Sequence, residues 1–106
     1  MTVSKRRIRI GKELFSLIYT DDLPGLYGHH KPRKKQLLIH NSQVLRDKQA
    51  TEIHEILHEI FRQRSIKLQA GGVDVEEALV EALSYPILDL IQENPDFIEY
   101  LLENKE

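Results

Sequence analysis

Two histidines and a glutamate stand at a spacing that suits metal chemistry. His54, Glu55 and His58 form a His-Glu-x-x-His motif. Residues four apart on a helix lie about one turn apart on the same side, so both imidazoles can reach one ion. Glu55 is turned by about 100° from His54, which places its carboxylate beside the ion, where it can take a proton from water. The motif predicts a zinc ion on His54 and His58, with Glu55 as general base.

A catalytic zinc usually has three protein ligands, and the third must come from elsewhere in the chain. There is no cysteine, and no histidine follows His58, so a carboxylate is expected. We predict Glu77 as the third ligand and Glu81, four residues on, as the group that accepts the free N–H of a ligand histidine. Glu76 is the alternative ligand. Glu77 also fits a capping box with Asp74, in which it would fold back onto its own helix end.

The motif lies within a segment with helical periodicity. Apolar residues recur three and four apart, at Ile53, Ile56, Leu57, Ile60 and Phe61. They predict a helix near 45–66, capped by Asn41 or Ser42 and buried on both sides of the histidines. For Glu77 to reach the metal, this helix must stop early, near 64–67. Residues 68–73 must then return as an irregular loop, for which Gly71 and Gly72 supply the freedom.

A second long helix is predicted to begin after Asp74. Its apolar stripe comprises Leu79, Val80, Leu83, Ile87, Leu90 and Ile91. Pro86 lies inside the stripe and should kink or split the helix. Asn94 and Pro95 predict the cap and first position of a short third helix through Leu102.

The first forty residues have the pattern of strands and turns. Strands are expected at Arg7–Ile10, Leu14–Tyr19 and Gln36–His40, with a hairpin pairing Gly25–His29 with Arg33–His40. The predicted fold is a single α+β domain over residues 1–106. A small antiparallel sheet from 5–40 packs on an active-site helix and a second long helix, both within 41–104.

Composition narrows the classes of function. The chain has 106 residues, 30% of them charged, with a net charge of −2, which argues against nucleic acid as a partner. The basic clusters Lys5–Arg7 and Lys31–Lys35 are interpreted first as solvated surface and second as a weak nucleic-acid patch. No apolar run approaches the ~20 residues of a membrane span, and no signal peptide is evident, so the cytoplasm is expected. The roles of His29, His30 and His40 stay open.

Three segments together resemble a known family. They are Thr51–His58, Glu76–Leu83 and Glu93-Asn94-Pro95, and the resemblance covers about residues 37–98. They resemble the small zinc-peptidase-like proteins of phages and prophages, similar to the ImmA/IrrE-like minimal gluzincins. The resemblance implies a small sheet, an active-site helix and a second helix giving the third ligand. By position it implies His54, His58 and Glu77 as ligands and Glu55 as base.

The sequence departs from that family in two ways. Glu81 stands before Ala82, where the family more usually has Phe before its next Ala. No downstream His or Tyr matches an oxyanion stabiliser, and Tyr85 and Tyr100 are expected to pack in the core.

Two functions follow as expectations. The first is a zinc metallopeptidase acting on a protein or peptide in the cytoplasm of the host cell if the chain is phage-encoded. The second is a non-catalytic, zinc-stabilised protein that binds a host or phage protein. The sequence leaves the substrate and the oligomeric state open.

Overall fold

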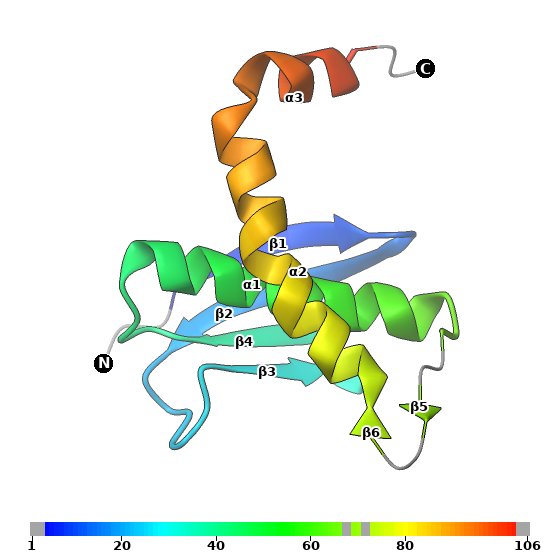
Figure 1. Ribbon diagram of the computed structural model, residues 1–106. Helices are drawn as coiled ribbons and strands as arrows, with labels where there is room; N and C mark the ends of the chain where they lie inside the picture. Colours follow the sequence, from blue (N-terminus) through cyan, green and yellow to red (C-terminus); the bar gives the residue numbers. More distant parts are fainter. Residues whose placement is uncertain (1–3, 67–68, 71–72, 104–106) are drawn as a thin grey trace.

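A computed structural model describes residues 4–66, 69–70 and 73–103 of the protein. It has an α+β fold, as predicted, with a four-stranded sheet, a two-stranded hairpin and three α-helices (Figure 1). The elements in chain order are β1 (Ser4–Ile10), β2 (Glu13–Thr20), β3 (Gly28–Lys31), the 3-10 helix η1 (Pro32–Lys34), β4 (Gln36–His40), α1 (Leu45–Gln63), β5 (Gln69–Ala70), β6 (Val73–Asp74), α2 (Val75–Glu93) and α3 (Pro95–Leu101).

The main sheet is mixed, which corrects the prediction of an antiparallel sheet. Its strand order is β1-β2-β4-β3. The β1–β2 and β3–β4 pairs are antiparallel, as expected, but β2 and β4 run parallel. The chain between β2 and β4 includes β3. This strand lies at the edge of the sheet, and β4 lies between β2 and β3. Parallel strands need such a long connection.

The core lies between this sheet and α1. Alternate residues of a strand face one side, and those facing α1 form the buried cluster Ile10, Phe15, Leu17, Tyr19, Leu37 and Ile39. Ile56 of α1 packs against the cluster. The expectation that apolar residues bury α1 on both sides of the histidines is only partly met. Its buried residues are Ala50, Glu55 and Glu59.

The second helix packs on α1 and extends beyond it. Its buried residues, Val80, Ser84 and Leu88, lie on one side. In Figure 1, α2 crosses α1 and carries α3 away from the sheet. Pro86 does not split α2, because it is exposed and the carbonyl of Ala82 that it leaves unbonded is on the same solvated side.

The ends of α1 differ in part from expectation. Val44, without a side-chain cap, precedes the helix, so the predicted capping by Asn41 or Ser42 is wrong. The helix ends at Gln63 with Arg64 as C-cap, and Ser65 follows with a left-handed φ of 53°. The helix therefore ends before residue 66, the end of the predicted range 45–66. This early end is what Glu77 needs in order to reach the histidines.

The return to α2 is more regular than expected. The strands β5 and β6 pair in a short antiparallel hairpin, in place of a wholly irregular loop. Residues 67–68 and 71–72 lie outside the described part, as does the Asp74 side chain with its predicted cap.

The third helix follows the prediction, but the Asn94 amide donates to the Leu90 carbonyl at 2.9 Å, at the end of α2. No helix in the described ranges has the length and hydropathy of a membrane span.

Candidate metal centre

The helix α1 presents its motif on two sides. His54 and His58, one turn apart, lie toward α2, and their side chains are 17% and 16% exposed. Glu55 and Glu59, also one turn apart, are buried at 6% and 0% exposure. The same spacing therefore places a histidine pair beside α2 and a carboxylate pair beside the sheet.

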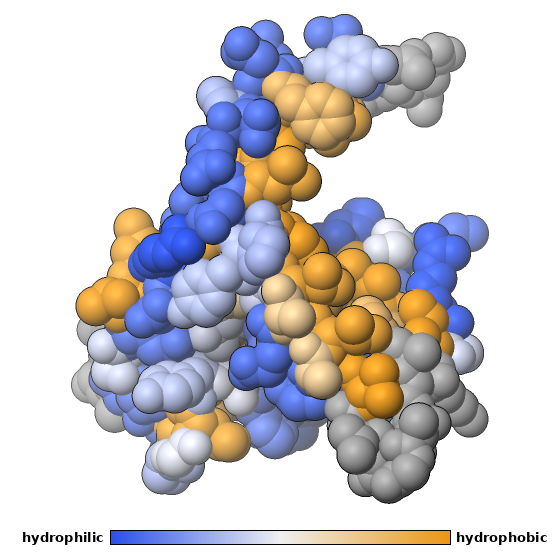
Figure 2. Space-filling view, viewed as in Figure 1, coloured by the Kyte–Doolittle hydropathy of each residue, from blue (hydrophilic) through white to orange (hydrophobic). Residues whose placement is uncertain are grey.

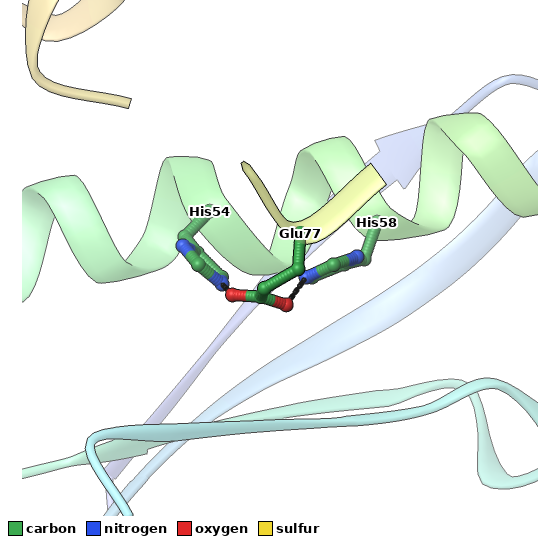
Figure 3. A group of neighbouring side chains, drawn as sticks. All are labelled: His54, His58 and Glu77. Carbon is green, nitrogen blue, oxygen red and sulfur yellow. Dashed lines mark ion pairs between the residues drawn. The ribbon is translucent and has the colours of Figure 1, made fainter. Parts of the chain in front are cut away.

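Glu77 joins the two histidines. Its Oε1 lies 3.0 Å from Nε2 of His54, and its Oε2 lies 2.9 Å from Nε2 of His58. Figure 3 shows the carboxylate between the two imidazoles, which come from α1 while Glu77 comes from the first turn of α2. The three predicted ligand residues are thus brought together.

This group has the geometry of a metal site. One ligand atom from each of His54, His58 and Glu77 can be chosen so that all lie within 4.8 Å of one another. A tetrahedral zinc with bonds of about 2.0–2.1 Å needs donor atoms roughly 3.3 Å apart, and each Nε2 lies about that far from one of the two Glu77 oxygens. Two imidazole nitrogens and one carboxylate oxygen are also a ligand set that zinc takes in catalytic sites. The group can therefore hold a metal ion.

Glu76 supports His58 from the other side. Its Oε2 lies 2.6 Å from Nδ1 of His58. A hydrogen bond to the second ring nitrogen fixes the orientation of a ligand histidine and leaves the first for the metal. Burial opposes charge on His58, but Glu76, Glu77 and Glu55 outweigh it and raise the pKa of the imidazole. The sequence assigned this orienting contact to Glu81; the structure has Glu76 there.

Glu55 is confined beside the site. A Cβ at residue 28 would lie 2.7 Å from Oε2 of Glu55 and 2.8 Å from Cγ2 of Thr51. Glycine at 28 therefore lets the edge strand β3 pass close to the carboxylate. Burial raises the pKa of Glu55 to about 7, with His58 lowering it and Glu77 raising it. A carboxylate that titrates near neutral pH can both accept and return a proton.

The site opens into a cleft of about 720 Å³ between α1, α2 and the start of β3. His54, Glu55 and Glu77 line it, together with residues farther along α2, among them Glu81 and Tyr85. The hydroxyl of Tyr85 donates to Asp47 at 2.5 Å. The prediction that Tyr85 and Tyr100 pack in the core is wrong, because they are 40% and 63% exposed.

A second buried carboxylate was not singled out from the sequence. Oε1 of Glu59 lies 2.6 Å from Nε2 of His30 on β3, and Oε2 accepts from Arg62 at 2.6 Å and Gln63 at 2.7 Å. Burial would raise the pKa of Glu59, but these hydrogen bonds hold it at about 2. The sequence did contain a signal for it. Glu59 follows Glu55 by four residues, so the two carboxylates lie on the same side of the helix, the side that meets the sheet.

The other histidines lie apart from the ligand group. His40 accepts a hydrogen bond at Nδ1 from the backbone of Ser42 at 3.1 Å, and His29 is exposed. The ring of His30 stacks near that of His58, with centroids 6.5 Å apart. Of the three, His30 is the one that contacts α1 next to the ligand group, through Glu59.

Comparison with protein-family models, curated proteins and solved structures found no match for this chain.

Proposed function

We propose that the protein is a zinc-dependent hydrolase that cleaves peptide bonds. The observation that carries the proposal is the arrangement in one cleft of a His54–His58–Glu77 ligand group and a separate buried carboxylate, Glu55. A purely structural zinc site has no need of a proton acceptor beside it. The resemblance of residues 37–98 to minimal gluzincins supports the same reaction.

Each residue of the site has a role in this chemistry. Nε2 of His54, Nε2 of His58 and a carboxylate oxygen of Glu77 would hold the zinc, and Glu76 would orient His58. When bound, zinc supplies a lowered water pKa and a polarised substrate carbonyl. Glu55 accepts the proton of the attacking water and can return it to the leaving amine.

The cleft suits an extended peptide. The edge strand β3 begins at Gly28, beside Glu55, and both Tyr27 and Gly28 line the cleft. An edge strand offers backbone N–H and C=O groups on its open side, and these can pair with a peptide in β conformation. The scissile bond would then lie in the cleft, between the start of β3 and α1, within reach of Glu55.

The substitution Glu55→Gln tests the assignment. The amide keeps the shape of the side chain but cannot accept a proton near neutral pH. Zinc content should therefore stay near one ion per chain, while cleavage of a denatured protein substrate falls by at least ~100-fold. Glu81→Gln, in the same cleft, is the matched control and should retain most of the activity.

Two results would contradict the proposal. Equal cleavage by wild type and Glu55→Gln would assign the activity to another base or to a contaminant. Full zinc occupancy without cleavage of any denatured substrate would favour the alternative, a zinc-stabilised protein that acts by binding a partner.

A further inference from the structure

The sheet has a second face, on the side away from α1. Strand register aligns its residues in rows that cross all four strands. One row is Arg7, Ser16, Gln36 and Lys31. The next row is Lys5, Ile18, Leu38 and His29. We call this surface the outer sheet face.

Cations stand at both edges of the outer sheet face. On β1, Lys5, Arg7 and Arg9 are exposed and point outward at every second residue, since Arg6, Ile8 and Ile10 pair with the inward positions of β2. Lys31 stands on β3, three strand spacings away, or ~14 Å at ~4.8 Å each.

None of these cations has an ion-pair partner among the residues that the structure describes. The cations in the ion pairs among the described residues are Lys35, Arg46, Arg62 and histidines, and none belongs to the outer sheet face. No outward position of the four strands carries Asp or Glu. The one acidic residue in these four strands, Glu13, lies on the α1 side and pairs with Lys35 and Arg62.

The small net charge conceals this separation. Residues 4–66 contain thirteen Lys and Arg against seven Asp and Glu, a net of +6. Residues 75–103 contain eight Asp and Glu and no Lys or Arg. The expectation against nucleic acid rested on the net charge of the whole chain. That value averages the basic sheet and α1 with the acidic helices α2 and α3.

We propose that the outer sheet face binds single-stranded nucleic acid. The cations at its edges suit the phosphate backbone, which supplies most of non-specific affinity. Between them lie Leu14, which is 41% exposed, and the partly exposed Ile18 and Leu38. Apolar side chains can contact unpaired bases, whose faces are stacked away in a duplex. The metal centre lies across the sheet, so this binding is independent of the proposed hydrolysis.

The experiment measures fluorescence anisotropy of a labelled 20-nucleotide oligo-dT at 50 and 200 mM salt. We expect a dissociation constant in the range of ~1–100 µM at the lower salt. Arg7→Glu should weaken binding about 10-fold, because it removes a phosphate contact and adds a repulsion. Arg64→Glu makes the same charge change at the exposed end of α1 and should change affinity by less than ~2-fold. Circular dichroism and zinc content should match wild type in both variants.

Four results would overturn the proposal. The first is no anisotropy change up to ~100 µM protein at 50 mM salt. The second is equal loss by Arg7→Glu and Arg64→Glu, which would indicate net charge alone. The third is equal affinity for duplex DNA. The fourth is self-association that Arg7→Glu abolishes and oligo-dT does not compete with, which would make the acidic helices of a second copy the occupant.

Discussion

The first turn of α2 gives the histidines of α1 two carboxylates with different tasks. Glu77 lies between the two Nε2 atoms, whereas Glu76 meets Nδ1 of His58. Neighbours on a helix differ by about 100° in direction, so the pair can reach both nitrogens of the same ring. Glu81, a turn farther on, lines the cleft instead.

This division of tasks predicts an order of zinc affinities. Glu77→Ala should lose the ion under conditions that keep wild type loaded, because two ligands remain where three are needed. Glu76→Ala should weaken binding by about 10–100-fold, the usual effect of removing a partner of a ligand histidine. Glu81→Ala should change it by less than ~3-fold. Competition with a zinc-sensitive chelator dye measures all three.

The comparison between Glu76 and Glu81 decides the assignment. A larger loss for Glu81→Ala than for Glu76→Ala would restore the role that the sequence gave to Glu81. Equal losses for Glu76→Ala and Glu77→Ala would make both carboxylates ligands.

At the residue scale, the sequence identified what depends on local spacing. The prediction of His54, Glu55 and His58 followed from one helical turn. The choice of Glu77 followed from its spacing of four residues to Glu81, and it required α1 to stop early. The contact of Glu76 with His58 depends on the angle at which α2 crosses α1, which no local pattern encodes. The pairing of Glu59 with His30 joins residues 29 positions apart and was missed for the same reason.

Among the elements, the contact between α1 and β3 relies on a buried charge. Glu59 is fully buried and accepts hydrogen bonds from both Arg62 and Gln63, beside His30. Glu59 is ionised at neutral pH, because its pKa is about 2. Its negative charge can therefore pair with Arg62 and accept hydrogen bonds from Gln63 and His30. Removing the carboxylate would leave a cavity and would take a hydrogen-bond partner from the partly buried His30 and Gln63, whereas the exposed Arg62 could turn to water.

We therefore expect Glu59→Ala to lower the free energy of unfolding by about 1–3 kcal/mol, the usual cost of leaving buried polar groups without a partner. Glu93→Ala, an exposed carboxylate on α2, should change it by less than ~0.5 kcal/mol. Urea unfolding of metal-free protein measures both, without interference from zinc. A Glu59→Ala variant as stable as Glu93→Ala would show that the buried network contributes nothing net.

The pH dependence has a definite sign. The pKa of Glu59 in the folded protein is about 2, below its ordinary 4.5. Its contribution is therefore present above about pH 4.5 and is lost as the pH falls toward 2. The stability difference between wild type and Glu59→Ala should shrink over that interval.

The elements were predicted better than their pairing. The periodicities of 14–19 and 36–40 identified two strands, but alternation does not specify which neighbour a strand takes or in which direction. The parallel pairing of β4 with β2 was therefore not predicted. Pro86 shows a local rule that the surroundings override. Proline removes one helical hydrogen bond, but the carbonyl left without a partner is on the solvated side, so α2 continues through Pro86.

On the scale of the whole molecule, stability should be uneven. The sheet and α1 enclose the core, whereas α3 has its main contacts with α2. Figure 2 shows apolar residues along the side of α2 and onto α3. Large side chains there are about half exposed: Leu79, Leu83, Leu90, Ile91, Phe97, Tyr100 and Leu101. Few tertiary contacts hold α3 in place.

Amide hydrogen exchange should follow this division. Segments with few buried contacts open at low free-energy cost, whereas core elements exchange only on global unfolding. We expect the amides of α3 to exchange fastest among the three helices, and those of α1 and β4 slowest. Mass spectrometry of peptides from zinc-loaded protein at several concentrations measures this. Protection of α3 equal to that of α1 at low concentration would contradict the prediction, because it would require a contact that holds the helix within one chain. Protection that appears only as the concentration rises would instead locate the apolar side of α2 and α3 in an interface between copies.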